Sequence, residues 1–250
     1  MHEISIKAEH VFNIGAFPVT NAVLLSTLTV VILVCIGMLV RRYMNIIPGR
    51  LQSIFELVAE QALELMESIL GTRAAALRYF PLIISIFLFI CISNWLGLFP
   101  GVGSIGIIHH IDLEKHAGFI PLFRAPASDL NFTVALAIIS VVSVNGLGML
   151  ALGARRYIRR FFTLKSPILS FVGILEFISE FVKIVSFSFR LFGNVFAGEV
   201  LLMIIGFLVP YFVPLPFLFL EIFVGFIQAI IFSMLTLVFI AGAVTSHDEH

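Results

Sequence analysis

Long apolar runs dominate the pattern of hydrophobic and polar positions along this chain. Nearly continuous apolar segments cover residues 20–41, 80–99 and 129–154. A further apolar stretch fills residues 167–246, with a proline-rich interruption at 210–216. A transmembrane helix needs about 20 predominantly apolar residues. The pattern therefore predicts an all-α polytopic membrane protein with about five membrane helices.

The last apolar stretch is too long for one ordinary span. Pro167 suits a helix start, and no proline follows until Pro210, which leaves room for a helix of over forty residues. Such a helix would run ~60 Å, about twice the ~30 Å thickness of the hydrocarbon core. It therefore either lies strongly tilted or breaks near Gly193 or Gly206. We expect two long, tilted helices that form an antiparallel hairpin within a single membrane domain.

Residues 48–70 follow a different pattern. Four acids recur there at spacings of four, four and three: Glu56, Glu60, Glu64 and Glu67. Helical periodicity places these acids on one face, with apolar positions between them. The segment is predicted to be an amphipathic interfacial helix on the membrane or against a partner, or a helix with one solvated face. Both interpretations stay open.

Composition fits a chain whose solvent is the lipid bilayer. Hydrophobic residues make up 60% of the 250 residues and charged residues only 12%. The formal net charge is zero, so bulk electrostatics do not indicate a nucleic-acid partner. Cys35 and Cys91 both lie inside apolar runs, where they are interpreted as small hydrophobic residues. No cofactor is predicted.

The distribution of basic residues predicts the orientation. Two loops hold ten of the fifteen Lys and Arg: Arg41, Arg42, Arg50, Arg73 and Arg78 in the first, and Arg155, Arg156, Arg159, Arg160 and Lys165 in the second. Cytoplasmic loops of membrane proteins collect Lys and Arg. We therefore expect the N-terminus outside and the C-terminus in the cytoplasm.

Ionisable residues inside the C-terminal apolar third are candidates for function: Glu176, Glu180, Lys183, Arg190, Glu199 and Glu221. A charge at the bilayer centre costs ~3 to over 10 kcal/mol, so such residues belong to ion pathways or internal pairs. Glu180 and Lys183 are three positions apart, and a structural pair and a functional role are equally compatible with that spacing.

Arg190 is the most informative of these charges. Its nearest acids along the chain, Glu180 and Glu199, lie ten and nine positions away. An arginine stays protonated in proteins, so it attracts a carboxylate but does not relay protons. We interpret Arg190 as a fixed positive charge for an acidic partner, with snorkelling to an interface as the alternative.

A hairpin turn at the prolines would bring Glu221 near Glu199 and Gln228 nearer Arg190. Two glutamates close together in a medium of low dielectric constant cannot both ionise cheaply. The sequence thus predicts that at least one of the two acids holds a proton and takes part in proton transfer.

Several motifs resemble subunit a of F-type ATP synthases, the membrane stator subunit of the Fo sector. The most specific is SFSFRLFGNVFAGE at residues 186–199, followed by NWLGLFP at 94–100 and PASDLNFT at 126–133. The resemblance implies that Arg190 is the essential arginine that faces the c-subunit ring between two proton half-channels. Many bacterial relatives carry histidine at the position of Glu221. A carboxylate pair, Glu199 with Glu221, would therefore replace a histidine relay here.

The resemblance also implies roles for further residues. Asn194, Glu199, Glu221 and Gln228 would belong to the half-channel that opens away from the cytoplasm, with Asp129 near its mouth, and Glu176 and Ser179 to the cytoplasmic one. Lys183 matches a position that is often basic in relatives and would be structural or auxiliary. The implied partners are the c-subunit ring, the peripheral-stalk b subunits and the remainder of the F1Fo complex, in a bacterial plasma (inner) membrane.

The implied function is to couple proton flow to ring rotation and ATP synthesis, without catalysis by this chain. No Gly-rich phosphate loop is present, which agrees with that expectation. The alternative is a secondary cation transporter, which typically shows repeated halves. A membrane protease would need a nucleophile and a base within reach of each other. His109, His110 and the terminal cluster 247–250 are expected to be solvated polar residues rather than a metal site.

Overall fold

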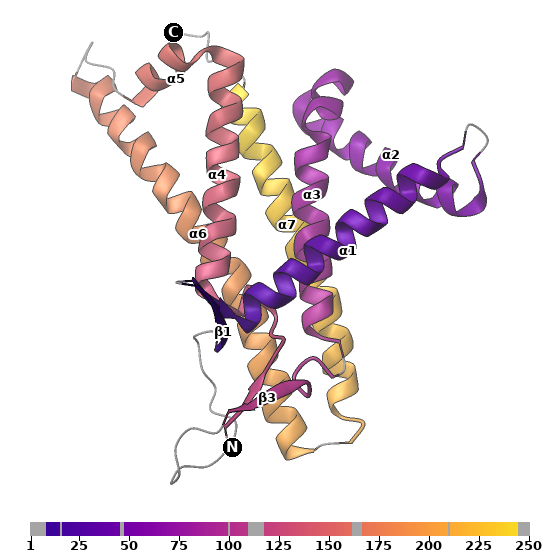
Figure 1. The fold of residues 1–250 in the computed structure, drawn as a ribbon. Helices are drawn as coiled ribbons and strands as arrows, with labels where there is room; N and C mark the ends of the chain where they lie inside the picture. Colours follow the sequence, from indigo (N-terminus) through magenta and orange to yellow (C-terminus); the bar gives the residue numbers. More distant parts are fainter. Residues whose placement is uncertain are drawn as a thin grey trace. The chain divides into compact units, whose positions relative to one another are not determined.

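The computed structural model describes residues 9–15, 17–45, 48–99, 101–109, 118–161, 167–209 and 211–244. Five helices in this part of the chain are long and apolar enough to cross a membrane (Figure 1). They are α1 (Asn21–Tyr43), α3 (Arg73–Gly97), α4 (Leu130–Leu152), α6 (Pro167–Leu208) and α7 (Pro214–Val244). The predicted class, an all-α polytopic membrane protein with about five membrane helices, is confirmed.

Shorter elements connect the long helices. Two are α-helices, α2 (Arg50–Leu70) and α5 (Ala154–Phe161), and one is a single 3-10 turn, η1 (Pro126–Ser128). Two antiparallel hairpins complete the described part: β1 (His10–Ile14) with β2 (Phe17–Thr20), and β3 (Gly106–His109) with β4 (Gly118–Pro121). In register, Ile14 pairs with Phe17 and His109 with Gly118. Neither the hairpins nor α5 was expected from the sequence pattern.

Local chemistry explains where two helices end. Gly71 follows α2 with a φ of 77°, a left-handed conformation in which its N–H donates to the carbonyl of Glu67. Glycine adopts this conformation without steric cost. Gly153, between α4 and α5, also has a left-handed conformation, with a φ of 84°. At the start of α4, Asp129 Oδ1 accepts the backbone N–H of Asn131 at 3.0 Å.

The long helix α6 is continuous over 42 residues and runs through Gly193 and Gly206. Of the two alternatives, a tilted helix or a break at a glycine, the break is therefore excluded. The helix α3 begins at Arg73, seven residues before the apolar run that predicted it, and contains Pro81. The sequence RAAALRY at its start carries two arginines but is rich in good helix formers, so hydropathy alone places the boundary too late.

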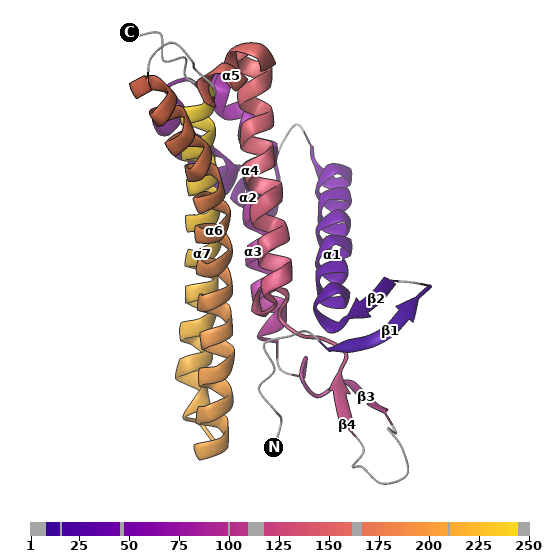
Figure 2. The same cartoon turned by 90° about the vertical axis from the view of Figure 1, so that its left-hand side faces the viewer.

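Contacts divide the chain into two compact units. The first contains Met1–Tyr43, Phe87–Thr133 and Phe189–Ile230. In this unit the indole N–H of Trp95 in α3 donates to the carbonyl of Ile222 in α7 at 3.1 Å, and the Phe87 and Phe226 rings meet edge to face. The second half of α6 and the first half of α7 lie side by side in this unit (Figure 2).

The second unit contains Met44–Ile86, Val134–Ser188 and Ile231–His250. Its core is a cluster of buried apolar side chains: Leu63, Met66, Ala76, Tyr79, Ile83, Val144, Tyr157, Leu237, Ile240 and Ala243. A hydroxyl pair, Ser140 and Thr236, lies 2.8 Å apart between α4 and α7. The stacked rings of Phe187 and Phe232 join α6 to α7 with centroids 4.7 Å apart.

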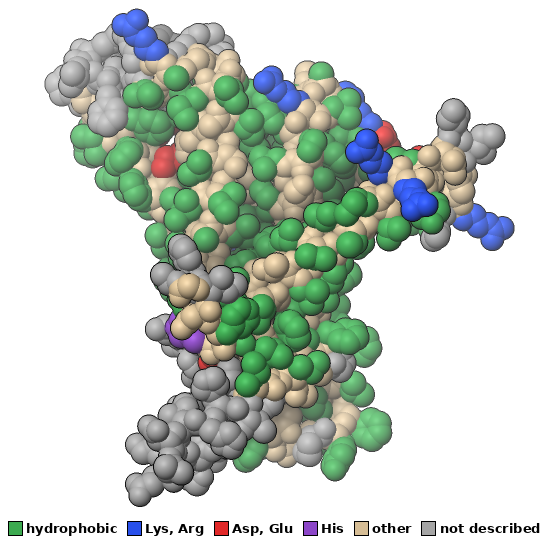
Figure 3. Space-filling model, in the orientation of Figure 1, with side chains coloured by type: hydrophobic (Ala, Val, Ile, Leu, Met, Phe, Trp, Pro, Cys, Tyr) green, Lys and Arg blue, Asp and Glu red, His purple; other side chains and the backbone are tan. Residues whose placement is uncertain are grey.

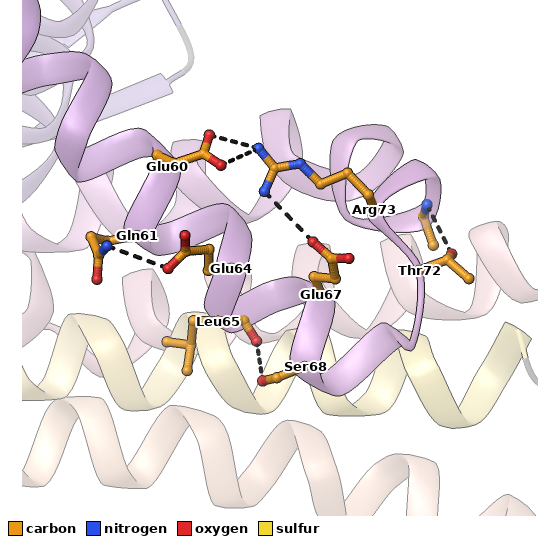
Figure 4. Close-up of polar contacts among 9 residues, drawn as sticks. Glu60, Gln61, Glu64, Leu65, Glu67, Ser68, Thr72 and Arg73 are labelled. Atoms are coloured by element: carbon orange, nitrogen blue, oxygen red, sulfur yellow. Dashed lines mark hydrogen bonds and ion pairs between the residues drawn. The ribbon is translucent and has the colours of Figure 1, made fainter.

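The acidic face of α2 is partly neutralised within the second unit. Arg73 at the start of α3 contacts Glu60 at 2.6 Å and Glu67 at 3.7 Å (Figure 4). Glu56 and Glu64 are exposed. Large apolar residues of α2, including Phe55 at 56% exposure, are exposed as well. The helix is amphipathic as predicted, and its position at the membrane interface stays a prediction.

Exposed hydrophobic side chains cover much of the visible surface of α1 (Figure 3). Val30, Val31, Val34, Met38 and Leu39 are each about half exposed or more, and Arg41 and Arg42 end the helix. A soluble protein would not leave a continuous apolar surface of this kind in water. Together with the five long apolar helices, this surface is that of an integral membrane protein.

Candidate functional site

Arg190 lies on an exposed face of α6 in the first unit. Gly193 and Ala197, about one and two turns further on, are exposed on the same face. Leu191 and Val195 point the other way and are buried at 0% and 7% exposure. The helix therefore presents the guanidinium together with small residues, which allow another helix to approach closely.

The next polar layer connects α6 to α7. Asn194 Nδ2 donates to Gln228 Oε1 at 3.3 Å, which holds the two amides against each other. Gln228 is 3% exposed, and its Nε2 is a buried donor without a hydrogen-bond partner among the described residues. A buried amide of this kind costs free energy unless it is satisfied, so a polar ligand such as water fits this position.

Glu199 and Glu221 line one cavity of about 150 Å³ in the first unit, together with Asn94. Glu221 is 8% exposed, and the Oε2 atom of Glu199 is buried. Within the described chain, neither Glu199 Oε2 nor Asn94 Oδ1 has a hydrogen-bond partner. The cavity thus brings two carboxylates and an amide oxygen together around a space large enough for water.

Gly198 makes room for the Glu221 side chain. A Cβ at position 198 would lie 2.0–2.1 Å from the carboxyl atoms of Glu221, which is far inside van der Waals contact. The Glu221 carboxylate is therefore packed directly on the backbone of α6. On α7, Gly225 has the corresponding role toward Asn94, whose Cβ would lie 3.2 Å from an added Cβ.

Arg124 is a further arginine of this unit, and it is not among the site residues expected from the sequence. Its side chain is 11% exposed, and its Nε lies 3.6 Å from Glu199 Oε1. The same Nε donates to Ser128 Oγ at 3.0 Å. Asp129 follows Ser128 and is 7% exposed. No spacing signal in the sequence marks Arg124, because 75 positions separate it from Glu199.

A polar network occupies the second unit. Lys183 Nζ contacts Glu180 Oε1 at 2.6 Å, so this pair exists, as the spacing allowed. Asn145 Nδ2 in α4 donates to Glu180 Oε2 at 3.1 Å, and the Tyr157 hydroxyl donates to Asn145 Oδ1 at 2.6 Å. Lys183 also lies over the Phe239 ring at 4.6 Å. The network links α4, α5, α6 and α7, and the contributions of Asn145 and Tyr157 could not be read from the sequence.

Glu180, Asn145 and Tyr157 line an open groove of about 340 Å³ whose other walls are mainly apolar. Glu176 lies one turn before Glu180 on α6 and is partly buried. Ser179 Oγ donates to the backbone carbonyl of Glu176 at 2.7 Å. Neither Glu176 nor Ser179, the residues expected for the second pathway, lines this groove, and the acid that lines it is Glu180.

No cluster of three or more potential metal ligands exists in the described residues. His110 and the terminal cluster at 247–250 lie outside the described residues, as does Lys165.

Comparisons with known proteins agree with the motifs. A family model described as ATP synthase A chain matches residues 23–241. The ATP synthase subunit a of Moorella thermoacetica is 31% identical over 242 residues, which cover 97% of this chain and 99% of the relative. The same subunit of Gloeobacter violaceus is 34% identical over 244 residues, 96% of this chain and 90% of the relative.

The ATP synthase subunit a of Campylobacter jejuni is 32% identical over 223 residues, 89% of each chain. These matches extend over the segments that carry Arg190 and the two glutamates, and they confirm the family that the motifs predicted. The chain therefore belongs to the ATP synthase subunit a family, the non-catalytic, proton-translocating stator subunits of the membrane sector.

Proposed function

We propose that this chain supplies two proton half-channels, with Arg190 between them along α6 and facing the c-subunit ring. The observation that carries the proposal is the exposure of Arg190 on a face with Gly193 and Ala197. A charged side chain within a membrane-spanning helix is costly, and an acid of a neighbouring subunit would compensate its charge. Small neighbours let a helix of another subunit bring its carboxylate close.

The first unit provides the half-channel that opens away from the cytoplasm. Asn194 and Gln228 form its end nearest Arg190, and Glu199, which lines the cavity with Glu221, lies about one and a half turns beyond Asn194 along α6. Asp129 is part of the entrance. Buried carboxyl and amide atoms around a space for water are the groups that a proton pathway needs.

The second unit provides the cytoplasmic half-channel. Glu176 and Ser179 lie on its part of α6, and the groove beside Glu180 gives access. Lys183 compensates the charge of Glu180 and has a structural role. The two pathways thus belong to different units. Along α6 the second unit ends at Ser188, and Arg190 is the second residue of the segment that belongs to the first unit.

Coupling follows from a fixed charge between two separate entrances. A c-subunit carboxylate ionises opposite Arg190 because the positive charge favours the ionised form. It takes up a proton from one half-channel and releases a proton to the other as the ring turns. A permanent cation at the boundary prevents protons from crossing without rotation.

The partners are the c-subunit ring, the peripheral-stalk b subunits and the remainder of the F1Fo complex. The location is a bacterial plasma (inner) membrane, with the N-terminus outside and the C-terminus in the cytoplasm. The basic residues at the end of α1 and in α5 support this orientation, because both segments would face the cytoplasm.

ATP-driven proton pumping by the reconstituted complex tests the function. Replacement of Arg190 by Ala removes the fixed charge and is expected to abolish pumping while the complex still assembles. Arg190→Lys keeps a positive charge but loses the planar guanidinium, and serves as the matched variant. Pumping at the wild-type rate by Arg190→Ala would refute the proposal and would favour a secondary transporter.

A further inference from the structure

Arg124 stands out among the polar groups of the first unit that the proposed function does not use. It precedes η1 and lies almost completely inside the unit, with 11% of its side chain exposed. An arginine buried to this extent needs a compensating charge and hydrogen bonds. Glu199 supplies the charge at 3.6 Å, and Ser128 Oγ accepts a hydrogen bond from the same Nε at 3.0 Å.

The support for the Arg124 side chain is itself fixed. Ser128 Oγ donates onward to the carbonyl of Ala125 at 2.9 Å. Ala125 is 8% exposed and packs so closely on α3 that a Cβ on Gly97 would lie 2.5 Å from its own Cβ. The turn that carries Arg124 is therefore held against α3 beside the cavity. The guanidinium is directed by packing as well as by attraction to Glu199.

The two acids of the cavity consequently have different surroundings. Glu199 Oε1 lies 3.6 Å from the Nε of Arg124, which is a permanent cation. Glu221 is packed on the backbone of Gly198 and shares the cavity with the neutral amide of Asn94. Glu199 and Glu221 are the acids that line the cavity, and Arg124 lies beside Glu199.

We propose that Arg124 is a positioning residue that keeps Glu199 as a permanent anion, so that Glu221 is the acid that carries the transported proton. The inference rests on the proposed function and assigns different roles to the two acids of its first half-channel. In the transfer step an O–H bond of a hydronium ion from the outer solution breaks as an O–H bond forms on a Glu221 oxygen, which leaves neutral water. The Glu221 O–H bond then breaks as an O–H bond forms on the rotor carboxylate, or on a water that passes the proton to it.

The test measures ATP-driven proton pumping by the reconstituted whole complex, normalised to the amount of assembled complex. Arg124→Gln leaves the Glu199 charge uncompensated, and we expect at least a ten-fold loss of pumping. Arg124→Lys keeps the charge and is expected to stay within about three-fold of wild type. Wild-type pumping by Arg124→Gln would overturn the inference.

The double variant Arg124→Gln/Glu199→Gln decides between a structural role and charge compensation. It removes both charges of the pair, so no uncompensated charge hinders assembly, and Glu221 remains. We expect its pumping to exceed that of Arg124→Gln at least five-fold, whereas Glu221→Gln stays inactive with or without these changes. A double variant as inactive as Glu221→Gln would show that Glu199 itself carries protons and would overturn the inference.

Arg190→Ala in the same assay separates this inference from the proposed function. If Arg190→Ala pumps at the wild-type rate, the proposed function fails whatever the Arg124 variants do. If Arg190→Ala is inactive and the double variant is not rescued, only the division of roles between Glu199 and Glu221 fails.

Discussion

Replacement of Gly198 by Ala tests whether the position of the Glu221 carboxylate matters for transport. The new Cβ would lie 2.0–2.1 Å from the Glu221 carboxyl atoms. Ordinary contact between such atoms begins at about 3.4 Å, so the carboxylate must move by roughly 1.3 Å. A flexible side chain can make this shift without unfolding the protein. Misplacement of a reacting group by ~1 Å can cost about 100-fold in rate.

We therefore expect the Gly198→Ala variant to assemble normally. Because a displacement of ~1 Å can cost about 100-fold in rate, we expect it to pump protons about 10- to 100-fold more slowly than wild type. Gly206→Ala is the matched control, because it makes the same change in α6 where an added Cβ meets nothing within 4 Å. Alanine stabilises a helix over glycine by about 1 kcal/mol at either position. Equal pumping by the two variants would refute the reasoning.

Two further predictions concern the polar network of the second unit. Tyr157→Phe removes the donor to Asn145 Oδ1 and should lower the free energy of unfolding by about 1–3 kcal/mol, seen as a lower Tm of the purified subunit complex, whereas Tyr211→Phe at a 77% exposed position should not. Lys183→Gln leaves Glu180 with an uncompensated charge and should lower the Tm by an amount that corresponds to about 2 kcal/mol. The double variant Lys183→Gln/Glu180→Gln should recover part of that loss, and a double variant less stable than Lys183→Gln would contradict the pairing.

Hydropathy predicted the membrane helices well because the bilayer imposes one rule on every span. The apolar runs at 20–41 and 129–154 correspond to α1 and α4 within two residues at each end. The start of α3 at Arg73 could not be predicted in this way, since helix propensity rather than hydropathy extends it. Likewise α5 is short and basic, and hydropathy shows only a charged loop there.

The candidate site was predictable where charge stands out in an apolar background. Arg190, Glu199 and Glu221 are conspicuous for that reason. Arg124 and Asn145 are not, because their importance comes from contacts with residues distant in sequence. No sequence pattern marks Gly198 either, since only the packing of Glu221 shows why a side chain is excluded at that position.

Disulfide cross-linking to the c subunit tests most directly the claim that Arg190 faces the rotor. Cysteine would replace Gly193 or Ala197 on the exposed face of α6, or Val195 on the buried face, in a chain whose Cys35 and Cys91 are changed to Ser. A disulfide forms only when the two Cβ atoms come within about 4.5 Å. The partner cysteine is placed on the c-subunit helix beside its intramembrane carboxylate. We predict oxidative cross-links from Gly193→Cys and Ala197→Cys and none from Val195→Cys. Cross-linking from Val195→Cys alone would contradict the account.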